Sequence, residues 1–123
     1  MNIEERLINF LELEHKSQLN QWQDLMNIAK EYLQNPTDNK KFAKQLAEAI
    51  HYHRSLMGSS KAYEGATELD MEFCKLATPI ARLGFGNAPP LIDYLKAELY
   101  YSQYYPEKFN RDEIERAIRE IMA

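Results

Sequence analysis

The sequence of 123 residues is poor in cysteine, glycine and proline. Its single cysteine, Cys74, excludes an internal disulfide, and four glycines with five prolines are too few for a linker-like or collagen-like chain. Apolar runs are only a few residues long, far short of the ~20 that span a bilayer. Glu4 and Glu5 stand where a secretory signal has basic residues. These absences predict a cytoplasmic protein that does not enter a membrane.

Charge and apolar content are those of an ordinary compact domain. Lysine and arginine number 15 and aspartate and glutamate 19, so the formal net charge is -4. Hydrophobic residues make up 45% of the chain and charged residues 28%, as in typical globular proteins. We therefore expect residues 1–123 to form a single domain. The acidic balance argues against general binding to nucleic acid or to an anionic membrane.

Apolar residues recur at steps of three and four along most of the chain, which predicts helices. No β-branched stretch alternates in steps of two, so we expect no strand. The predicted helices cover about residues 3–34, 39–57, 67–84, 89–105 and 111–122, and the first becomes two if the polar run at 16–18 breaks it. The stripe of the first helix includes Leu7 and Leu11. The predicted fold class is all-α, an antiparallel helical bundle of five to six helices.

Short polar residues and prolines mark the ends of these helices. Either Thr37 or Asp38 is expected to cap the second helix. Thr67, with Asp70 three residues later, resembles a capping box at the start of the third. Asn110 makes the last cap. Pro79 is expected to kink or restart the third helix, because proline has no amide hydrogen to donate.

Two Glu-x-x-His pairs have the spacing that helical bundles use for metal ligands. They are Glu12 with His15, and Glu48 with His51. The neighbours of Glu48 and His51 at helical spacing are polar, as with Lys44, so this pair is expected to face solvent instead of a bundle core. We therefore expect no metal and no cofactor. No motif of a nucleophilic or phosphate-binding site occurs either, so we expect no catalytic residues.

The second predicted helix carries a local excess of positive charge. Residues 36–62 hold two acids and five bases, and Lys40, Lys41, Lys44 and Arg54 are candidates for contact with nucleic acid or another anion. The alternative interpretation is a solvated helix face beside acidic neighbours. Exposed aromatic residues that would stack on bases do not alternate with these cations.

The sequence from His51 to Ser60, HYHRSLMGSS, followed by GATEL from Gly65, resembles the centre of a histidine-phosphotransfer domain. In that family an exposed helical histidine precedes Leu-Lys-Gly-Ser-Ser, and a helix starting with Gly-Ala follows. The resemblance covers about residues 51–76 and implies a helical bundle with a phosphoacceptor histidine. That acceptor would be His53, with His51 as the second candidate.

The register of this sequence departs from the family pattern. Four residues before Gly58 stands Arg54 instead of a histidine, and Met57 occupies the place of the lysine. His53 also falls on the apolar stripe of its helix. The helix therefore resembles a phosphotransfer or pseudo-phosphotransfer module without the acceptor in its usual position.

Tyrosines are concentrated in one part of the chain. Five of the eight fall within twelve residues: Tyr94, Tyr100, Tyr101, Tyr104 and Tyr105. Adjacent residues on a helix point about 100° apart, so these side chains cannot all face one core. Tyrosine offers a large contact area at low entropic cost. We therefore predict a protein-binding surface here, with Phe85 and the Pro89-Pro90 turn beside it.

These observations predict a small non-enzymatic protein that binds another protein and has no small-molecule substrate. It would be an inhibitor, an immunity or anti-defence protein, an adaptor, or a small subunit of a larger complex. Two alternatives remain open. One is a helical subunit that contacts nucleic acid within a nucleoprotein effector complex, and the other is the phosphotransfer module.

Overall fold

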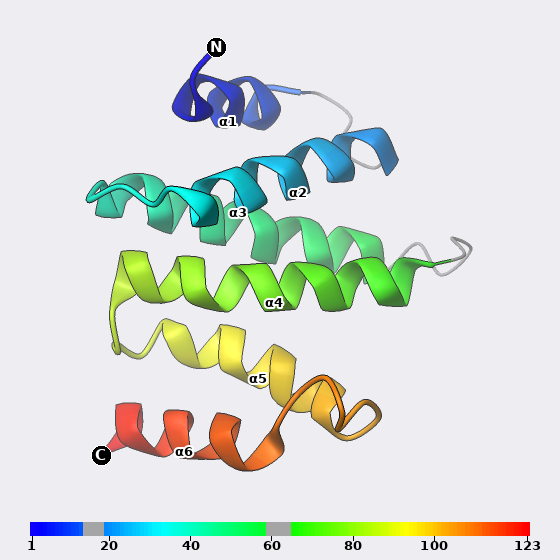
Figure 1. Cartoon of the computed structure of the whole chain (residues 1–123), viewed down its shortest axis with the longest axis vertical. Coiled ribbons are helices and arrows are strands. Elements are labelled where there is room, and N and C mark those ends of the chain that lie inside the picture. Colours follow the sequence, from blue (N-terminus) through cyan, green and yellow to red (C-terminus); the bar gives the residue numbers. More distant parts are fainter. Residues whose placement is uncertain (14–18, 59–64) are drawn as a thin grey trace.

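The computed structural model describes residues 1–13, 19–58 and 65–123. All regular structure in this part of the chain is helical (Figure 1). The helices are α1 (Ile3–Leu11), α2 (Leu19–Gln34), α3 (Lys40–Gly58), α4 (Ala66–Phe85), α5 (Leu91–Ser102) and α6 (Arg111–Met122). The predicted all-α architecture is confirmed. The first predicted segment is two helices, α1 and α2, and the polar run at 16–18 that was expected to separate them lies outside the described residues.

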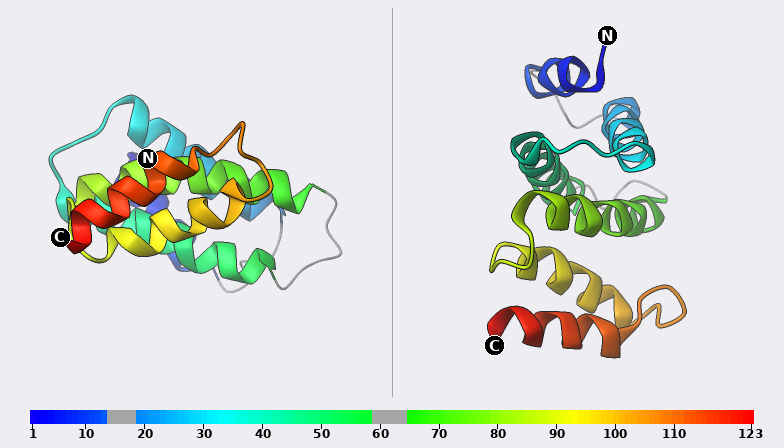
Figure 2. Two further views of the ribbon diagram at one scale, coloured as in Figure 1. Left: turned by 90° about the horizontal axis from the view of Figure 1, so that it is seen from below. Right: turned by 60° about the vertical axis from the view of Figure 1, so that its left-hand side comes forward.

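The chain runs back and forth, so that each helix is roughly antiparallel to the one before it (Figure 1). The helices form an elongated stack with the two termini at opposite ends (Figure 2). In the middle, α4 packs against α2, α3 and α5. At the ends, α1 contacts α2 and α3, and α6 contacts α5. The molecule therefore has two distinct end faces, one formed by α1 and the other by α6.

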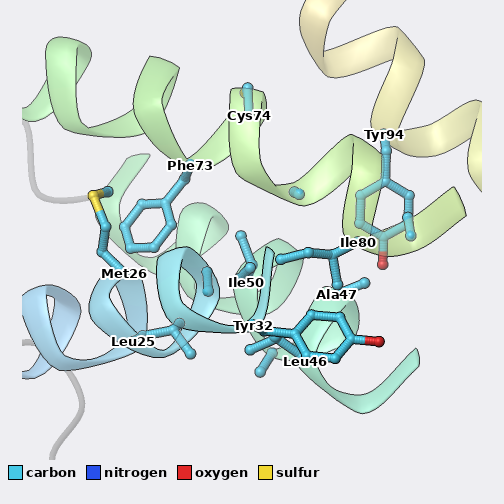
Figure 3. Close-up of a cluster of buried hydrophobic side chains, with 14 of the residues drawn as sticks. Leu25, Met26, Tyr32, Leu46, Ala47, Ile50, Phe73, Cys74, Ile80 and Tyr94 are labelled. Atoms are coloured by element: carbon cyan, nitrogen blue, oxygen red, sulfur yellow. The ribbon is translucent and has the colours of Figure 1, made fainter. Parts of the chain in front are cut away.

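The core lies where α2, α3 and α4 meet (Figure 3). Tyr32 of α2 contacts Phe42 of α3 edge to face, with ring centroids 5.1 Å apart. Other buried side chains of this region are Leu25, Met26, Leu46, Ala47, Ile50, Phe73 and Ile80. Burial of these apolar side chains is the main force that holds the three helices together.

The start of α3 differs from the sequence prediction. Asn39 caps this helix, because its Oδ1 accepts a hydrogen bond from the Phe42 amide at 3.1 Å. Thr37 supports the cap instead of forming it, since its Oγ1 accepts from the Asn39 amide at 3.3 Å. The prediction of Thr37 or Asp38 as the cap is therefore wrong by one or two positions.

The ends of α4 and α6 test two other predicted caps. Gly65 precedes α4 with φ +86° and without a side-chain cap, so the predicted capping box of Thr67 and Asp70 does not form. Asp70 instead accepts hydrogen bonds from Arg54 and Tyr101. At α6 the prediction is confirmed, because Asn110 Oδ1 accepts from the Glu113 amide at 3.2 Å.

Two further expectations need correction. Of the two alternatives expected at Pro79, a kink or a restart, the restart is wrong, because α4 continues from Ala66 to Phe85 around the proline. Leu11 was expected on the apolar stripe but is exposed, while its neighbour Phe10 is buried. The break between α1 and α2 explains the second difference, because two separate helices need not share one continuous apolar face.

No helix in the described part of the chain combines the length and the apolar character needed to cross a membrane.

The backbones of α3 and α4 come very close at Gly84. A Cβ atom at this position would lie 2.8 Å from the Lys44 amide nitrogen and 3.1 Å from the Lys44 Cα. Both are backbone atoms, so they cannot move aside unless α3 itself shifts. Glycine is therefore required here for close packing, although its backbone conformation is ordinary.

We predict that Gly84→Ala lowers the free energy of unfolding by about 1–3 kcal/mol, because the added methyl group pushes α3 away from α4. Urea unfolding followed by circular dichroism measures this change. The neighbouring exposed Leu83 provides the control, and Leu83→Ala should have a clearly smaller effect. Equal effects of the two substitutions would contradict the close packing.

Candidate protein-binding surface

Two of the five clustered tyrosines are strongly exposed. Tyr100 stands near the end of α5 and Tyr104 in the turn that follows, and their exposed fractions are 58% and 62%. Their ring centroids lie 5.5 Å apart, so the rings contact each other one turn apart on the same side. We call Tyr100 and Tyr104 the tyrosine pair. They form a continuous aromatic surface beside solvent.

The other three tyrosines have different positions. Tyr94 and Tyr101 are buried, and Tyr105 is half-buried. The prediction that Tyr94 and Tyr101 contribute to a contact surface is therefore wrong. Tyr101 instead forms the base of the tyrosine pair, since its ring contacts that of Tyr100 at 5.4 Å. On its other side it stacks on Phe109, with centroids 5.8 Å apart.

A polar network fixes the base of the tyrosine pair to two other helices. Arg54 of α3 donates two hydrogen bonds to the Asp70 carboxylate of α4, from Nε at 2.6 Å and from an Nη at 3.1 Å. The hydroxyl of Tyr101 donates to the same carboxylate. Burial opposes the charge of Arg54, but the bonds and charge of Asp70 outweigh it and raise the Arg54 pKa. This network joins α3, α4 and α5 at one level.

Lys75 of α4 holds the connection between α5 and α6 next to Phe109, the ring on which Tyr101 stacks. The ammonium group of Lys75 lies over the Phe109 ring, 4.2 Å from its centroid, and donates to the carbonyl oxygen of Lys108. Lys108 in turn lies 5.8 Å from the ring centroid of Tyr105. Cations over aromatic faces are favourable contacts. The segment that carries Tyr104 is therefore attached to α4 at both of its ends.

Phe85 lies away from the tyrosine pair, at the end of α4. It is half-buried, and its ring is 6.4 Å from that of Tyr94. The ammonium group of Lys44 is 5.7 Å from the Phe85 centroid, and the His51 ring is 5.3 Å from that of Tyr94. Phe85 and Tyr94 thus connect α3, α4 and α5 near the start of α5. The predicted surface divides into an exposed pair and a mostly packed group.

The basic residues of α3 are only partly available to a ligand. Lys40, Lys41 and Lys44 are exposed at the start of the helix. Among the described residues, no carboxylate lies within ion-pair distance of any of them. Arg54 was predicted to belong to this patch, but its guanidinium is held by Asp70. The patch is therefore limited to three lysines at one end of α3.

The histidine suggested by the phosphotransfer resemblance is inside the protein. His53 is 1% exposed, its Nδ1 donates to the Ala49 carbonyl oxygen at 2.6 Å, and its ring lies 4.9 Å from that of Phe10. Phosphotransfer requires an exposed imidazole that a partner can approach, and His53 does not offer one. His51 is exposed, but Ser59 and Ser60 of the same motif lie outside the described residues.

The structure also locates the groups weighed for metal binding. Glu48 and His51 are exposed on α3, as their polar neighbours predicted, and His15 lies outside the described residues. Within the ranges that the structure describes, no three histidine, cysteine or acidic side chains gather as metal ligands would.

Sequence reasoning missed one perturbed carboxyl group, Glu98 of α5. It borders a hollow of about 270 Å³ that α6 residues also line. Burial raises its pKa, while a hydrogen bond from Thr78 Oγ1 at 2.9 Å and the charges of Lys75 and Arg82 act in the opposite direction. Apolar periodicity cannot identify such a residue, because its position on α5 can either face solvent or be covered by a neighbouring helix.

No family model, no curated protein and no solved structure matches the chain. Its function must therefore be inferred from the geometry and chemistry of its own side chains.

Cys74 and Tyr94 predict how stability depends on alkaline pH. Burial raises the pKa of each group to about 12, from ordinary values of 9.0 for the thiol and 10.0 for the phenol. Below those ordinary values both states are protonated and the folded protein keeps its full stability. As the pH rises toward 12, the unfolded chain loses these protons first, so the free energy of unfolding falls by about 1.4 kcal/mol per pH unit for each group.

Urea unfolding between pH 8 and pH 11 measures this fall. Cys74→Ala removes one of the groups, so we predict a shallower decline for that variant, whatever its stability at pH 8. The same slope in both proteins would show that the Cys74 thiol ionises equally easily when folded.

We predict that Asp70→Asn costs about 1–3 kcal/mol of stability, because it leaves the half-buried Arg54 without a counter-charge. Urea unfolding measures the loss. The exposed Arg6–Glu31 ion pair is the matched control, and Glu31→Gln should cost less than about 1 kcal/mol. In the double variant Arg54→Met with Asp70→Leu part of the stability should return. A loss with Asp70→Asn no larger than that with Glu31→Gln would contradict a structural role for the network.

Proposed function

We propose that this chain is a non-enzymatic protein-binding module that contacts its partner through the tyrosine pair. The observation that carries this proposal is the exposure of two adjoining rings, 58% and 62%, above a base fixed by Tyr101. Aromatic side chains of this size are normally buried or used in contacts. Here they are exposed together on a well-anchored part of the fold.

The physical advantage of this arrangement is preorganisation. A partner that covers Tyr100 and Tyr104 gains apolar contact area without having to order the backbone that carries them. Tyrosine is enriched at binding hot spots, where truncation to alanine costs about 2 kcal/mol or more. The base, Tyr101, is bound to Asp70, which is bound in turn to Arg54, and this anchoring supports the role.

The net charge of -4 favours a partner with a basic surface, since opposite charges accelerate and orient the encounter. Binding of this kind fits an inhibitor, an immunity or anti-defence protein, an adaptor, or a small subunit of a complex. In each case the module acts by covering a surface or by bridging two molecules. No reaction chemistry is needed for either.

Contact with nucleic acid is the weaker candidate on geometric grounds. Lys44 lies beside Phe85 at the end of α4, whereas the base of the tyrosine pair contacts Asp70 near the start of α4. Fifteen residues of helix separate Asp70 from Phe85, which corresponds to roughly 22 Å at 1.5 Å per residue. The exposed rings are thus not placed among the exposed lysines, as a stacking site for bases would require.

A photo-crosslinking amino acid placed at position 100 or 104 tests this function in the source cell. We predict a discrete adduct from each position and none from position 52, because Tyr52 is 59% exposed on α3 but lies outside the pair. With the captured partner purified, Tyr100→Ala with Tyr104→Ala should weaken binding at least tenfold, and Tyr52→Ala should leave it unchanged. Unchanged affinity after loss of both rings would refute the proposal.

A further inference from the structure

The two ends of the helical stack have different outer surfaces. At one end, α6 exposes mainly charged side chains such as Arg116, Arg119 and Glu120, apart from Met122 in its last turn. At the other end, α1 exposes Ile8 at 54% and Leu11 at 39%. Stacked helices normally cover their ends with polar faces. The α1 end does not follow this pattern.

Acidic side chains surround Ile8 on α1. Positions three and four residues away lie next to each other on a helix surface. The neighbours of Ile8 at this spacing are Glu4, Glu5 and Glu12, together with Leu11. All three glutamates are exposed. The outer face of α1 thus has an apolar centre with carboxylates around it.

Two hollows flank this face and give it shape. One, of about 320 Å³, lies between α1 and α3, with Ile8, Leu11 and Phe42 in its lining and Lys41 as its cation. The other, of about 300 Å³, lies between α1 and α2, and its lining includes Phe10 and Leu13. Hollows beside a helix accept the side chains of another helix when the two pack.

The geometry points to a docking site on α1 for a basic amphipathic helix of another protein. Its apolar side chains would cover Ile8 and Leu11 and enter the flanking hollows, and its lysines or arginines would face Glu4, Glu5 and Glu12. The charge of the rim selects this occupant, because its three carboxylates outnumber Lys41 and therefore attract a basic helix and repel an acidic one. Glu4 also accepts a hydrogen bond from Asn39 Nδ2 at 3.2 Å.

This site is separate from the tyrosine pair. The α1 helix contacts α2 and α3, whereas α5 contacts α4 and α6. Loss of one surface therefore leaves the other in place, and the two proposals fail independently. Together they would let the chain bridge two molecules.

A designed 18-residue helix of leucine and lysine at helical spacing is the probe. Fluorescence anisotropy measures its binding to the full chain, and an otherwise identical peptide with glutamate in place of lysine is the negative control. We predict binding of the lysine peptide only, weakened at least tenfold by Ile8→Ser with Leu11→Ser. Leu83→Ser with Met122→Ser removes two exposed apolar side chains elsewhere and should leave affinity within twofold.

Charge variants separate the α1 site from general attraction. Glu5→Lys with Glu12→Lys should weaken binding at least tenfold. Glu107→Lys with Glu120→Lys changes the net charge by the same amount at exposed positions near the other end, and should change affinity much less. Equal effects of the two pairs, or retained binding after loss of Ile8 and Leu11, would overturn the proposal.

Self-association is the remaining outcome to distinguish. Sedimentation equilibrium of the unliganded chain is expected to show a monomer. A dimer that Ile8→Ser with Leu11→Ser dissociates would assign this face to a second copy of the chain and overturn the proposed partner. Far-UV circular dichroism and thermal melting of every variant establish that the changes act on binding and not on folding.

Discussion

The contact between α3 and α4 is the constraint on which the rest of the structure depends. At Gly84 the two backbones come so close that a methyl group would meet the Lys44 amide nitrogen at 2.8 Å. Ten residues further along α3, Arg54 bonds to Asp70 of α4. The close contact also lets α4 present its remaining sides to α2 and to α5. The core lies where α2, α3 and α4 meet, and the outer helices α1 and α6 pack onto this centre through their neighbours.

Polar contacts give this apolar stack a defined geometry. Apolar packing alone tolerates small shifts of one helix along another. The carboxylate of Asp70 accepts hydrogen bonds from Arg54 on α3 and from Tyr101 on α5, and a large shift of any of the three helices would break at least one of them. The same bonds hold the ring of Tyr101 under Tyr100. The precision of the exposed surface thus originates in a half-buried ion pair.

The fold could be predicted from apolar periodicity because each helix buries one regular stripe. The ends of the helices were harder to predict, because several short polar residues near Asn39 could each form the cap. The sequence alone does not show which of them does. Among the tyrosines, spacing showed that some must be exposed but not which ones. Asp70 decides this by binding Tyr101, and that contact joins residues 31 positions apart. Local sequence holds no signal for such a pair, and the same is true of Asp70 with Arg54.

The exposed residues of α1 and α5 have different physical supports, and this affects what each surface can recognise. Tyr100 and Tyr104 stand on a base fixed by hydrogen bonds and ring contacts, which favours a partner of complementary fixed shape. Ile8 and Leu11 instead lie on a nine-residue helix at the end of the stack, with hollows on both sides. Apolar side chains that border hollows can contact partner side chains of varied size. The surrounding glutamates would then make the contact selective through their charge. The two proposed surfaces, one selective for shape and one for charge, would together suit the chain to bridge two unlike proteins.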